Sequence, residues 1–374
     1  MNTTKSHLLA ALLGYSDTLV SSGEDHTCVL KSNGKAYCWG DNSVGQLGNG
    51  TTKSSMSPVA VSGGLEFKSI SAGWDHNCGI AVDNKAYCWG RGRYGRLGNG
   101  SAENSMVPTA VTGGLTFASI DSGMAHTCGI TTGGDAFCWG RGEDGILGRN
   151  SVDSSLVPVP VSGGLSFGSI HAASATTCGI TTNGDAYCWG ASDFGNLLGL
   201  GPGNRDRALA PGRVDGGFKF KPGSISVGLD HSCAVTTADK AVCWGRGRDG
   251  KLGIGSADAL GVIENLMTPR EVKGNLSFAS LASGVFQTCG VTTAGKAYCW
   301  GRNASGQLGN GTTTMQVEPA AVSTNLNFTH VAVGSKHACG VSSDDDVYCW
   351  GDGNAGKLGT RSSDNKLTPT KVKL

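Results

Sequence analysis

The chain has 374 residues with 30 basic and 29 acidic ones, so its overall charge does not favour binding to nucleic acid or to an anionic membrane. Glycine accounts for 61 residues and charged residues for only 16%, a composition typical of many short strands joined by tight turns. No apolar stretch is long enough to span a bilayer.

Residues 1–16 are predicted to be an N-terminal extension or an edge segment of the fold. The apolar run at residues 8–13 follows Lys5, as in the core of a secretion signal. The run is short, and no clear small-residue cleavage site follows it. A signal peptide, an edge segment and a chain that has already lost its leader all stay open.

From residue 17 onward the sequence is a sevenfold repeat. Every repeat carries two cysteines at one fixed spacing, the second within Cys-Trp-Gly, and no cysteine is left over. A repeated unit of this kind buries its apolar surface against its neighbours, which favours one repeat array over two or three separate domains. The repeats are expected near residues 17–61, 62–111, 112–161, 162–214, 215–272, 273–322 and 323–374.

The second repeat illustrates the predicted strands. Short runs rich in β-forming residues occur at 67–73, 76–81, 85–90 and 107–111, and a glycine-rich loop at 91–100 precedes the last. Four such strands in each of seven repeats predict an all-β fold, a seven-bladed β-propeller of four-stranded antiparallel blades.

The cysteine spacing predicts one disulfide within each blade. Cys28 and Cys38 lie symmetrically about Asn33, so a hairpin of the second and third strands places them opposite each other, about 4.5–5.5 Å apart at Cα. Each bridge should stabilise the fold by roughly 2.5–3 kcal/mol. The expected pairs are Cys28–Cys38, Cys78–Cys88, Cys128–Cys138, Cys178–Cys188, Cys233–Cys243, Cys289–Cys299 and Cys339–Cys349.

Side-chain alternation predicts how the blades pack. In the second repeat Cys78 and Cys88 share one face of the hairpin with small residues, while Tyr87 and Trp89 project from the other. We therefore expect the Tyr/Trp face of each blade to pack on the Ala/Cys face of the next, with the repeated tryptophans in the core.

Paired cysteines near a histidine also raise the possibility of a zinc site. Five repeats place a histidine before the first cysteine, but the fourth and sixth have Thr176 and Gln287, so a metal cannot be the shared purpose of this position. We expect these histidines to cap the start of the second strand through hydrogen bonds, and we expect no metal. They are His26, His76, His126, His231 and His337.

Two apparent catalytic motifs belong to the repeat. Residues 90–95 match a dinucleotide-binding fingerprint and residues 164–168 match a nucleophile elbow, but both stretches recur in altered form in neighbouring repeats, and no helix is expected after the first. Seven equivalent cysteine pairs likewise argue for a scaffold. The sequence thus predicts no enzyme, no catalytic residue and no cofactor.

Persistent disulfides imply an oxidising compartment, so an extracellular, cell-surface or periplasmic location is expected. Seven Asn-x-Ser/Thr sequons are consistent with secretion, but three of them come with the Asn-Gly-Thr/Ser turn of the repeat, so the signal is weak. The sequons begin at Asn2, Asn49, Asn99, Asn275, Asn303, Asn310 and Asn327.

The unit Gly-x-x-His-x-Cys … Ala-Tyr-Cys-Trp-Gly-x-x-x-x-Gly-x-Leu-Gly resembles the regulator of chromosome condensation repeat, from Thr18 to Leu374 in all seven copies. The resemblance implies a seven-bladed propeller. The family includes a nuclear nucleotide-exchange factor, a plant ultraviolet-B photoreceptor, a secreted bacterial inhibitor of β-lactamases and extracellular receptor domains, so it constrains function weakly. The cysteine pairs make this chain most similar to the extracellular kind.

Comparing the repeats with one another indicates where specificity lies. Residues between the first and second strands vary most, and the antiparallel order places them beside the loops between the third and fourth strands. The insertions at Leu200–Arg213 and Ala257–Leu266 are expected in these latter loops. The candidate partner-binding residues are Trp74, Met124, Leu229, Val285, Phe286, Arg91, Arg93, Tyr94, Arg96, Arg246 and Arg248.

Apolar side chains mixed with arginines are typical of protein-binding surfaces, although such residues can also pack only on neighbouring loops. We therefore expect a non-enzymatic protein-recognition propeller, monomeric, with a protein partner and no nucleic acid. The alternatives are an intracellular guanine-nucleotide exchange factor or chromatin-associated regulator, and an architectural subunit of a larger assembly. Whether the ring closes within one repeat or across the termini stays open.

Overall fold

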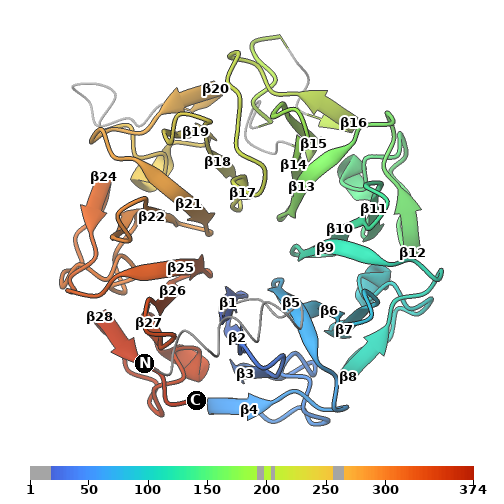
Figure 1. Ribbon diagram of the computed structural model, residues 1–374, viewed down its shortest axis with the longest axis horizontal. Helices are drawn as coiled ribbons and strands as arrows, with labels where there is room; N and C mark the ends of the chain where they lie inside the picture. Colours follow the sequence, from blue (N-terminus) through green and yellow to red (C-terminus); the bar gives the residue numbers. More distant parts are fainter. Residues whose placement is uncertain (1–17, 192–197, 204–206, 256–264) are drawn as a thin grey trace.

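The computed structural model describes residues 18–191, 198–203, 207–255 and 265–374. These residues form seven four-stranded antiparallel blades arranged in a ring, the all-β propeller that the repeat predicted (Figure 1). Residues of the first strands line a channel at the centre of the ring. The predicted N-terminal extension, residues 1–16, lies outside the described residues. No helix of the described part is long and apolar enough to cross a membrane.

Each blade runs outward from the channel in chain order (Figure 1). The first strands, at the channel, are β1 (Leu19–Ser22), β5 (Phe67–Ala72), β9 (Phe117–Ser122), β13 (Phe167–Ala172), β17 (Ser226–Val227), β21 (Phe278–Ser283) and β25 (Phe328–Val333). The second strands are β2 (His26–Leu30), β6 (His76–Ala81), β10 (His126–Thr131), β14 (Thr176–Thr181), β18 (His231–Val235), β22 (Gln287–Thr292) and β26 (His337–Ser342).

The third strands are β3 (Ala36–Gly40), β7 (Ala86–Gly90), β11 (Ala136–Gly140), β15 (Ala186–Ala191), β19 (Ala241–Gly245), β23 (Ala297–Gly301) and β27 (Val347–Gly351). The fourth strands, at the outer edge, are β4 (Ser55–Ala60), β8 (Ser105–Ala110), β12 (Ser155–Pro160), β16 (Arg207–Arg213), β20 (Leu266–Glu271), β24 (Gln316–Ala321) and β28 (Lys366–Lys371). Short 3-10 turns follow four of the third strands: η1 (Arg93–Gly95), η2 (Glu143–Gly145), η3 (Arg248–Gly250) and η4 (Asn354–Gly356).

The second and third strands pair in the predicted register, with the two cysteines of every blade directly opposite each other. All seven pairs are bonded, so the described cysteines are not available as zinc ligands. Their Cα atoms lie 4.0–4.1 Å apart, slightly closer than expected. Opposed residues in an antiparallel ladder alternate between a wider Cα spacing, where they exchange backbone hydrogen bonds, and a narrower one, where they do not. The cysteine pairs have the narrower spacing.

Tryptophans fill the spaces between blades. Trp139 is fully buried against the cystine of Cys78 and Cys88 in the preceding blade, and its Nε1 donates a hydrogen bond to the Arg96 carbonyl at 3.0 Å. Trp89 contacts the cystine of the first blade in the same way. The aromatic face therefore packs on the cystine face, as predicted, but on that of the preceding blade rather than of the next.

The repeated histidines connect blades instead of capping their own strand, which corrects the prediction. His76 Nε2 lies 2.9 Å from Thr127 Oγ1 in the next blade, and that hydroxyl donates at 2.8 Å to the Arg96 carbonyl. His26, His126, His231 and His337 make the corresponding contact with Asn77, Thr177, Thr288 and Thr27, at 2.8–2.9 Å.

Two repeats have another residue in place of the histidine, and the structure explains one of these replacements. The residue facing Gln287 in the following blade is Ala338, which has no hydroxyl to accept a hydrogen bond, and Gln287 Nε2 donates to the His337 carbonyl at 3.3 Å instead. Thr176 donates within its own blade, to the Ala191 carbonyl at 2.9 Å.

The ring closes by contacts between complete blades. Every blade takes its four strands from one repeat, and β25–β28 meet β1–β4 side by side (Figure 1). Trp39 donates to the Lys357 carbonyl at 2.8 Å, and Lys357 Nζ contacts Asp25 at 2.6 Å and Asp352 at 2.7 Å. Burial alone would lower the pKa of Lys357, but its hydrogen bonds with these carboxylates outweigh burial and raise it.

The two insertions differ in part from expectation. Residues Arg207–Arg213, predicted to extend a loop, form the outer strand β16, while 204–206 lie outside the described residues. Extra residues also precede β17 in the fifth blade, where Phe220 and Ile225 are two positions further apart than Phe167 and Ile170, and Phe220 forms only an isolated bridge with Thr236. Of the insertion at Ala257–Leu266, residues 257–264 lie outside the described part.

Candidate functional site

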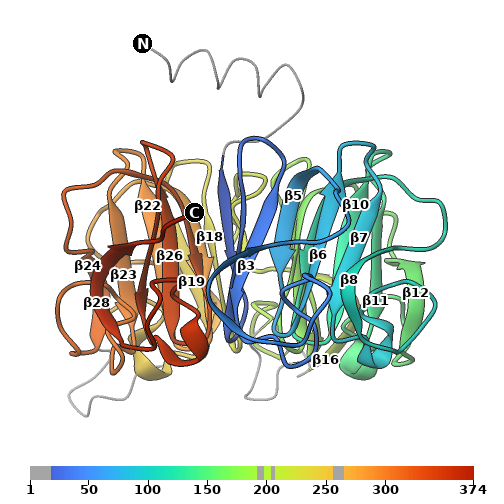
Figure 2. The ribbon, with the colours of Figure 1, turned by 90° about the horizontal axis from the view of Figure 1, so that it is seen from below.

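One end of the propeller gathers the loops between the first and second strands and those between the third and fourth strands, and we call this end the rim (Figure 2). Backbone hydrogen bonds join the two loop sets, as from Arg91 N to Asp75 O at 2.9 Å and from Arg141 N to Ala125 O at 2.9 Å. The rim therefore brings together the loops that vary most between repeats.

The central channel opens at the rim. Its volume is about 380 Å³, and small residues of the first strands line most of its wall. Inside it, Asp121 accepts hydrogen bonds from Ser71 Oγ at 3.1 Å and Ala172 N at 2.7 Å, and burial raises the pKa of its carboxyl. The mouth is lined by Glu24, Trp74, Met124, Ser174, Leu229, Val285 and Ser335.

A second hollow of about 330 Å³, the rim pocket, lies where the first three blades meet at the rim. Six of the eleven candidate residues line it, together with four others from the same loops. Its lining is Glu24, Trp74, Asp75, Arg91, Arg93, Tyr94, Arg96, Met124, Ala125 and Arg141.

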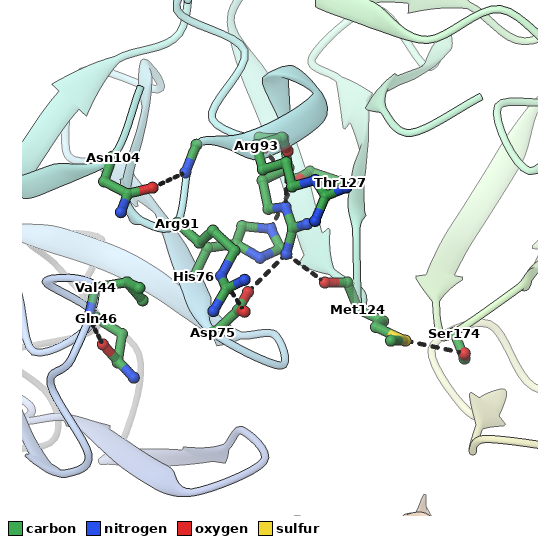
Figure 3. Close-up of polar contacts among 12 residues, drawn as sticks. Val44, Gln46, Asp75, His76, Arg91, Arg93, Asn104, Met124, Thr127 and Ser174 are labelled. Carbon is green, nitrogen blue, oxygen red and sulfur yellow. Dashed lines mark hydrogen bonds and ion pairs between the residues drawn. The ribbon is translucent and has the colours of Figure 1, made fainter. Parts of the chain in front are cut away.

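An ion-pair cluster centred on Asp75 shapes the rim pocket (Figure 3). Its carboxylate contacts Arg91 Nε and Arg96 Nη1, each at 2.6 Å. Arg96 also donates to the carbonyls of Met124 at 2.7 Å and Arg93 at 3.0 Å, and the side chain is only 5% exposed. Arg96 therefore holds the loops in place, and little of it is accessible to a partner. Burial lowers the pKa of its guanidinium, while Asp75 opposes that shift.

The outer part of the pocket is formed by Arg93 and Tyr94 in η1. The exposed Arg93 guanidinium lies 4.7 Å from the centre of the Tyr94 ring, a cation–π contact. Tyr94 itself has φ of 66°, in the left-handed region that few bulky residues adopt. The same conformation in η2 and η3 belongs to Asp144 and Asp249, which tolerate it better.

Glu24 lies where the pocket meets the channel mouth. Burial, followed by the nearby charges of Asp25 and Asp75, raises the pKa of Glu24 to about 7, against the opposing effect of Lys357 and Lys336. Its charge therefore changes near neutral pH.

The remaining candidates lie in blades five and six, across the channel from the rim pocket (Figure 1). Leu229 and Val285 line the channel mouth. Phe286 lies 5.1 Å from the guanidinium of Arg302. Arg246 contacts Asp230 at 3.6 Å, and Arg248 is exposed. The candidates thus form two groups, of which the larger encloses the pocket.

Glu24, Asp75, Ala125 and Arg141 complete the pocket but were not among the candidate residues. Glu24, Asp75 and Ala125 lie in the loops that the comparison of repeats marked as most variable, so that comparison carried the signal for three of them, while Arg141 lies in the neighbouring loop after a third strand. Within the described residues, no group of three or more His, Cys, Asp or Glu side chains is placed to hold a metal ion.

Curated relatives match only part of the chain. A mitochondrial RCC1 domain-containing protein of Arabidopsis thaliana, RUG3, is 32% identical over 128 residues, 34% of this chain and 29% of its own length. The ultraviolet-B receptor UVR8 of the same plant is 30% identical over 129 residues, 34% and 27% respectively. These matches span less than a third of each relative's own length.

Solved structures share the fold over almost the whole chain. Human WBSCR16 aligns with a TM-score of 0.80 at 16% identity, covering 91% of this chain and 94% of that one. Yeast RCC1 (Prp20), in its structure with Kap60, gives 0.79 at 19% identity, covering 96% and 85%. The ectodomain of the Arabidopsis thaliana receptor kinase ACR4 gives 0.57 at 20% identity, covering 96% and 98%.

Two family models, both described as the regulator of chromosome condensation (RCC1) repeat, match along the chain. One matches all seven repeats, at residues 18–46, 67–96, 117–146, 172–196, 224–251, 278–307 and 328–357. The other matches 33–80, 83–130, 133–180, 294–341 and 344–374. Each covers more than half of the sequence; the matches of the first begin at or near the first strand of each blade, and most of those of the second run from the third strand of one blade to the second strand of the next. The chain belongs to the regulator of chromosome condensation repeat family.

Proposed function

We propose that this protein is a non-enzymatic recognition propeller that binds a protein partner through its rim. The observation that carries the proposal is the rim pocket, where variable loops of three blades bring Trp74, Met124 and Tyr94 together with arginines. Tryptophan, tyrosine and arginine dominate the energetics of protein interfaces, and a concave site surrounded by accessible loops suits an anchoring side chain.

The comparisons support a protein partner at the level of the family. Yeast RCC1 (Prp20) has been solved bound to Kap60, and Prp20p of Saccharomyces cerevisiae also binds Gsp1p and histones. At 19–20% identity these likenesses concern the fold, so the partner of this chain is a separate question.

We further propose that the protein works in an oxidising compartment: outside the cell, at its surface or in a periplasm. The support is the disulfide in every blade, because cytosolic thiols are kept reduced. Receptor-kinase ectodomains of the same fold fit such a location, whereas the relative RUG3 is mitochondrial.

An intracellular exchange factor is the second candidate, favoured by the fold shared with yeast RCC1. Mass spectrometry of the protein from its native source, without reduction, separates the two. We expect a mass 14 hydrogens below that of the reduced chain, one for each cysteine. Free thiols in the native protein would contradict the extracellular proposal and favour the intracellular one.

Rim recognition is tested by capture of co-purifying proteins with variants of the purified propeller. Trp74→Ala and Phe286→Ala remove large apolar side chains from the rim, and each should reduce capture severalfold. Val82→Ala is the matched control, since Val82 is 42% exposed at the opposite end of the second blade. Thermal unfolding checks that the variants are folded. Partners retained by both rim variants would contradict the proposal.

A further inference from the structure

We infer that the rim pocket is a socket for a short acidic segment of the partner, whose carboxylate pairs with Arg93. The inference rests on the proposed function and specifies the chemical character of the partner segment that binds. It is carried by the charge balance within the pocket, by the way Arg93 is held, and by a matched loop elsewhere in the ring.

The charges that line the pocket do not balance. Four arginines face only two carboxylates, Glu24 and Asp75. Asp75 is occupied by Arg91 and Arg96, and Arg141 contacts Glu143 at 2.6 Å. Among the described residues no carboxylate lies within ion-pair distance of Arg93. The pocket therefore holds one exposed cation whose natural partner, an anionic oxygen, is missing.

Arg93 is also held in place before any partner arrives. Its guanidinium lies over the Tyr94 ring, and its carbonyl accepts the Nε hydrogen bond of the buried Arg96. A cation already ordered by its neighbours loses less side-chain entropy on pairing with a carboxylate. Tyr94 has the left-handed backbone conformation that this loop position also has in η2, η3 and η4, and its ring lies beneath Arg93.

The lining of the pocket also favours particular residues next to the acidic residue of the partner segment. Trp74 and Met124 line the pocket from the loops of the second and third blades, and Met124 Sδ accepts a hydrogen bond from Ser174 at 3.2 Å. These apolar surfaces favour an acidic residue flanked by an apolar one over a uniformly charged tail.

The fifth blade provides a matched comparison. Its loop reads Arg246-Gly-Arg248-Asp249-Gly250, where the second blade has Arg91-Gly-Arg93-Tyr94-Gly95. Arg246 and Lys251 both contact Asp230, as Arg91 and Arg96 contact Asp75. The difference is the next residue, since Arg248 precedes a carboxylate and Arg93 precedes an aromatic ring. Arg248 is therefore an exposed arginine at the same loop position that lies outside the pocket.

Glu24 makes the binding dependent on pH. It lies beside Asp25 and Asp75, with Lys336 and Lys357 facing it, and its pKa is raised to about 7. Above this pH Glu24 carries a charge that repels an acidic segment, and below it Glu24 is neutral. Affinity for the segment should fall as the pH rises from 6 to 8, and Glu24→Gln should remove that contribution.

The test uses a fluorescent peptide of alternating glutamate and leucine, with a glutamine–leucine peptide as the neutral probe, followed by anisotropy at low salt. We expect the acidic peptide to bind the wild-type propeller and the Arg248→Glu variant. Arg93→Glu should weaken binding roughly tenfold, because an attractive charge becomes repulsive. Equal weakening by Arg93→Glu and Arg248→Glu would mean that the peptide responds only to the overall charge of the rim, which would overturn the inference. Equal binding of the acidic and the neutral peptide would overturn it as well.

The capture experiment separates this inference from the proposed function. If Trp74→Ala abolishes capture of native partners while the acidic peptide fails to bind, the rim is a recognition surface but its partner is not acidic at this pocket. If capture also survives the rim variants, both ideas are wrong. Arg93 is exposed, so loss of folding is not expected in Arg93→Glu, and thermal unfolding verifies this.

Discussion

Hydrogen bonding fixes the protonation of the histidines between blades. The Thr127 hydroxyl donates its proton to the Arg96 carbonyl, so it accepts from His76, whose Nε2 must carry hydrogen. The same holds where Asn77 Oδ1 accepts from His26. In all five histidines Nδ1 is then a bare acceptor, and it is buried without a hydrogen-bond partner in the described structure. Only the neutral ring suits this site.

Thr127→Val tests this contact at a single residue. Valine keeps the shape of threonine but leaves the buried His76 N–H unpaired, which should lower the free energy of unfolding by about 1–3 kcal/mol. Thr127→Ser is the control, because it keeps the hydroxyl and should cost less. Guanidinium unfolding with the disulfides intact measures both. Equal loss in the two variants would point to packing in place of the hydrogen bond.

At the scale of the structural element, the loop after each third strand joins neighbouring blades. In the second blade it supplies the Arg96 carbonyl, which accepts from both Trp139 and Thr127 of the next blade. Gly98 brings the loop close enough, since a Cβ there would lie 2.6 Å from Trp139 Nε1, and its φ is +67°. Gly100 also has a positive φ, +83°, but a Cβ there meets nothing within 4 Å.

Alanine substitutions at Gly98 and Gly100 distinguish the cost of a strained backbone from the cost of a clash with Trp139. Gly100→Ala should cost only the left-handed conformation, about 1 kcal/mol. Gly98→Ala adds a clash with buried Trp139 and should cost on the order of 3 kcal/mol. Guanidinium unfolding gives the two values. Similar losses at both positions would mean that the loop yields readily and that the close approach to Trp139 is unimportant.

At the scale of the whole molecule, the blades are held in a ring by buried polar contacts as well as by tryptophans. Burial lowers the pKa of all five bridging histidines, and that of His126 falls to about 3. A group whose folded-state pKa is depressed stabilises the fold above its unfolded pKa, near 6.5 for histidine, and loses this contribution as the pH falls.

Acid should therefore weaken the ring. Between pH 6.5 and 3, His126 alone should lower the free energy of unfolding by about 1.4 kcal/mol per pH unit, and the other four act in the same direction. Guanidinium unfolding at pH 7 and pH 5 measures the loss. His126→Gln should reduce this slope, because glutamine occupies the equivalent position at Gln287 and does not titrate. A free energy of unfolding that stays constant between pH 7 and pH 5 would contradict the conclusion that the buried histidines are neutral in the folded protein.

The fold could be predicted from the sequence because the patterns that indicate it lie within single repeats. A fixed cysteine spacing about a turn sets the hairpin register, and alternation places Trp89 and Cys88 on opposite faces whatever surrounds them. The predicted direction of blade packing was wrong, because the two faces are complementary in either order and a repeat cannot indicate which neighbour supplies which face.

The candidate site was predictable in composition but not in arrangement. Comparison of the repeats identified Trp74 as a variable rim residue, and the antiparallel strand order placed Arg91 and Arg93 beside it. It could not show that Arg96 is buried while Arg93 is exposed, because both are arginines in one loop and the contacts of Arg96 with Asp75 and the Met124 carbonyl depend on how the loops are placed.

The sequence by itself determined seven disulfide-linked blades of four strands, since spacing and periodicity act within each repeat. The tertiary structure decided the contacts between blades: the histidine bridges, the ring closure at Lys357 and the rim pocket. The histidine bridges join residues about 50 positions apart, the ring closure joins opposite ends of the chain, and the rim pocket combines loops from three blades. Such contacts depend on how the blades are placed in the ring, a relation that no stretch within one repeat contains.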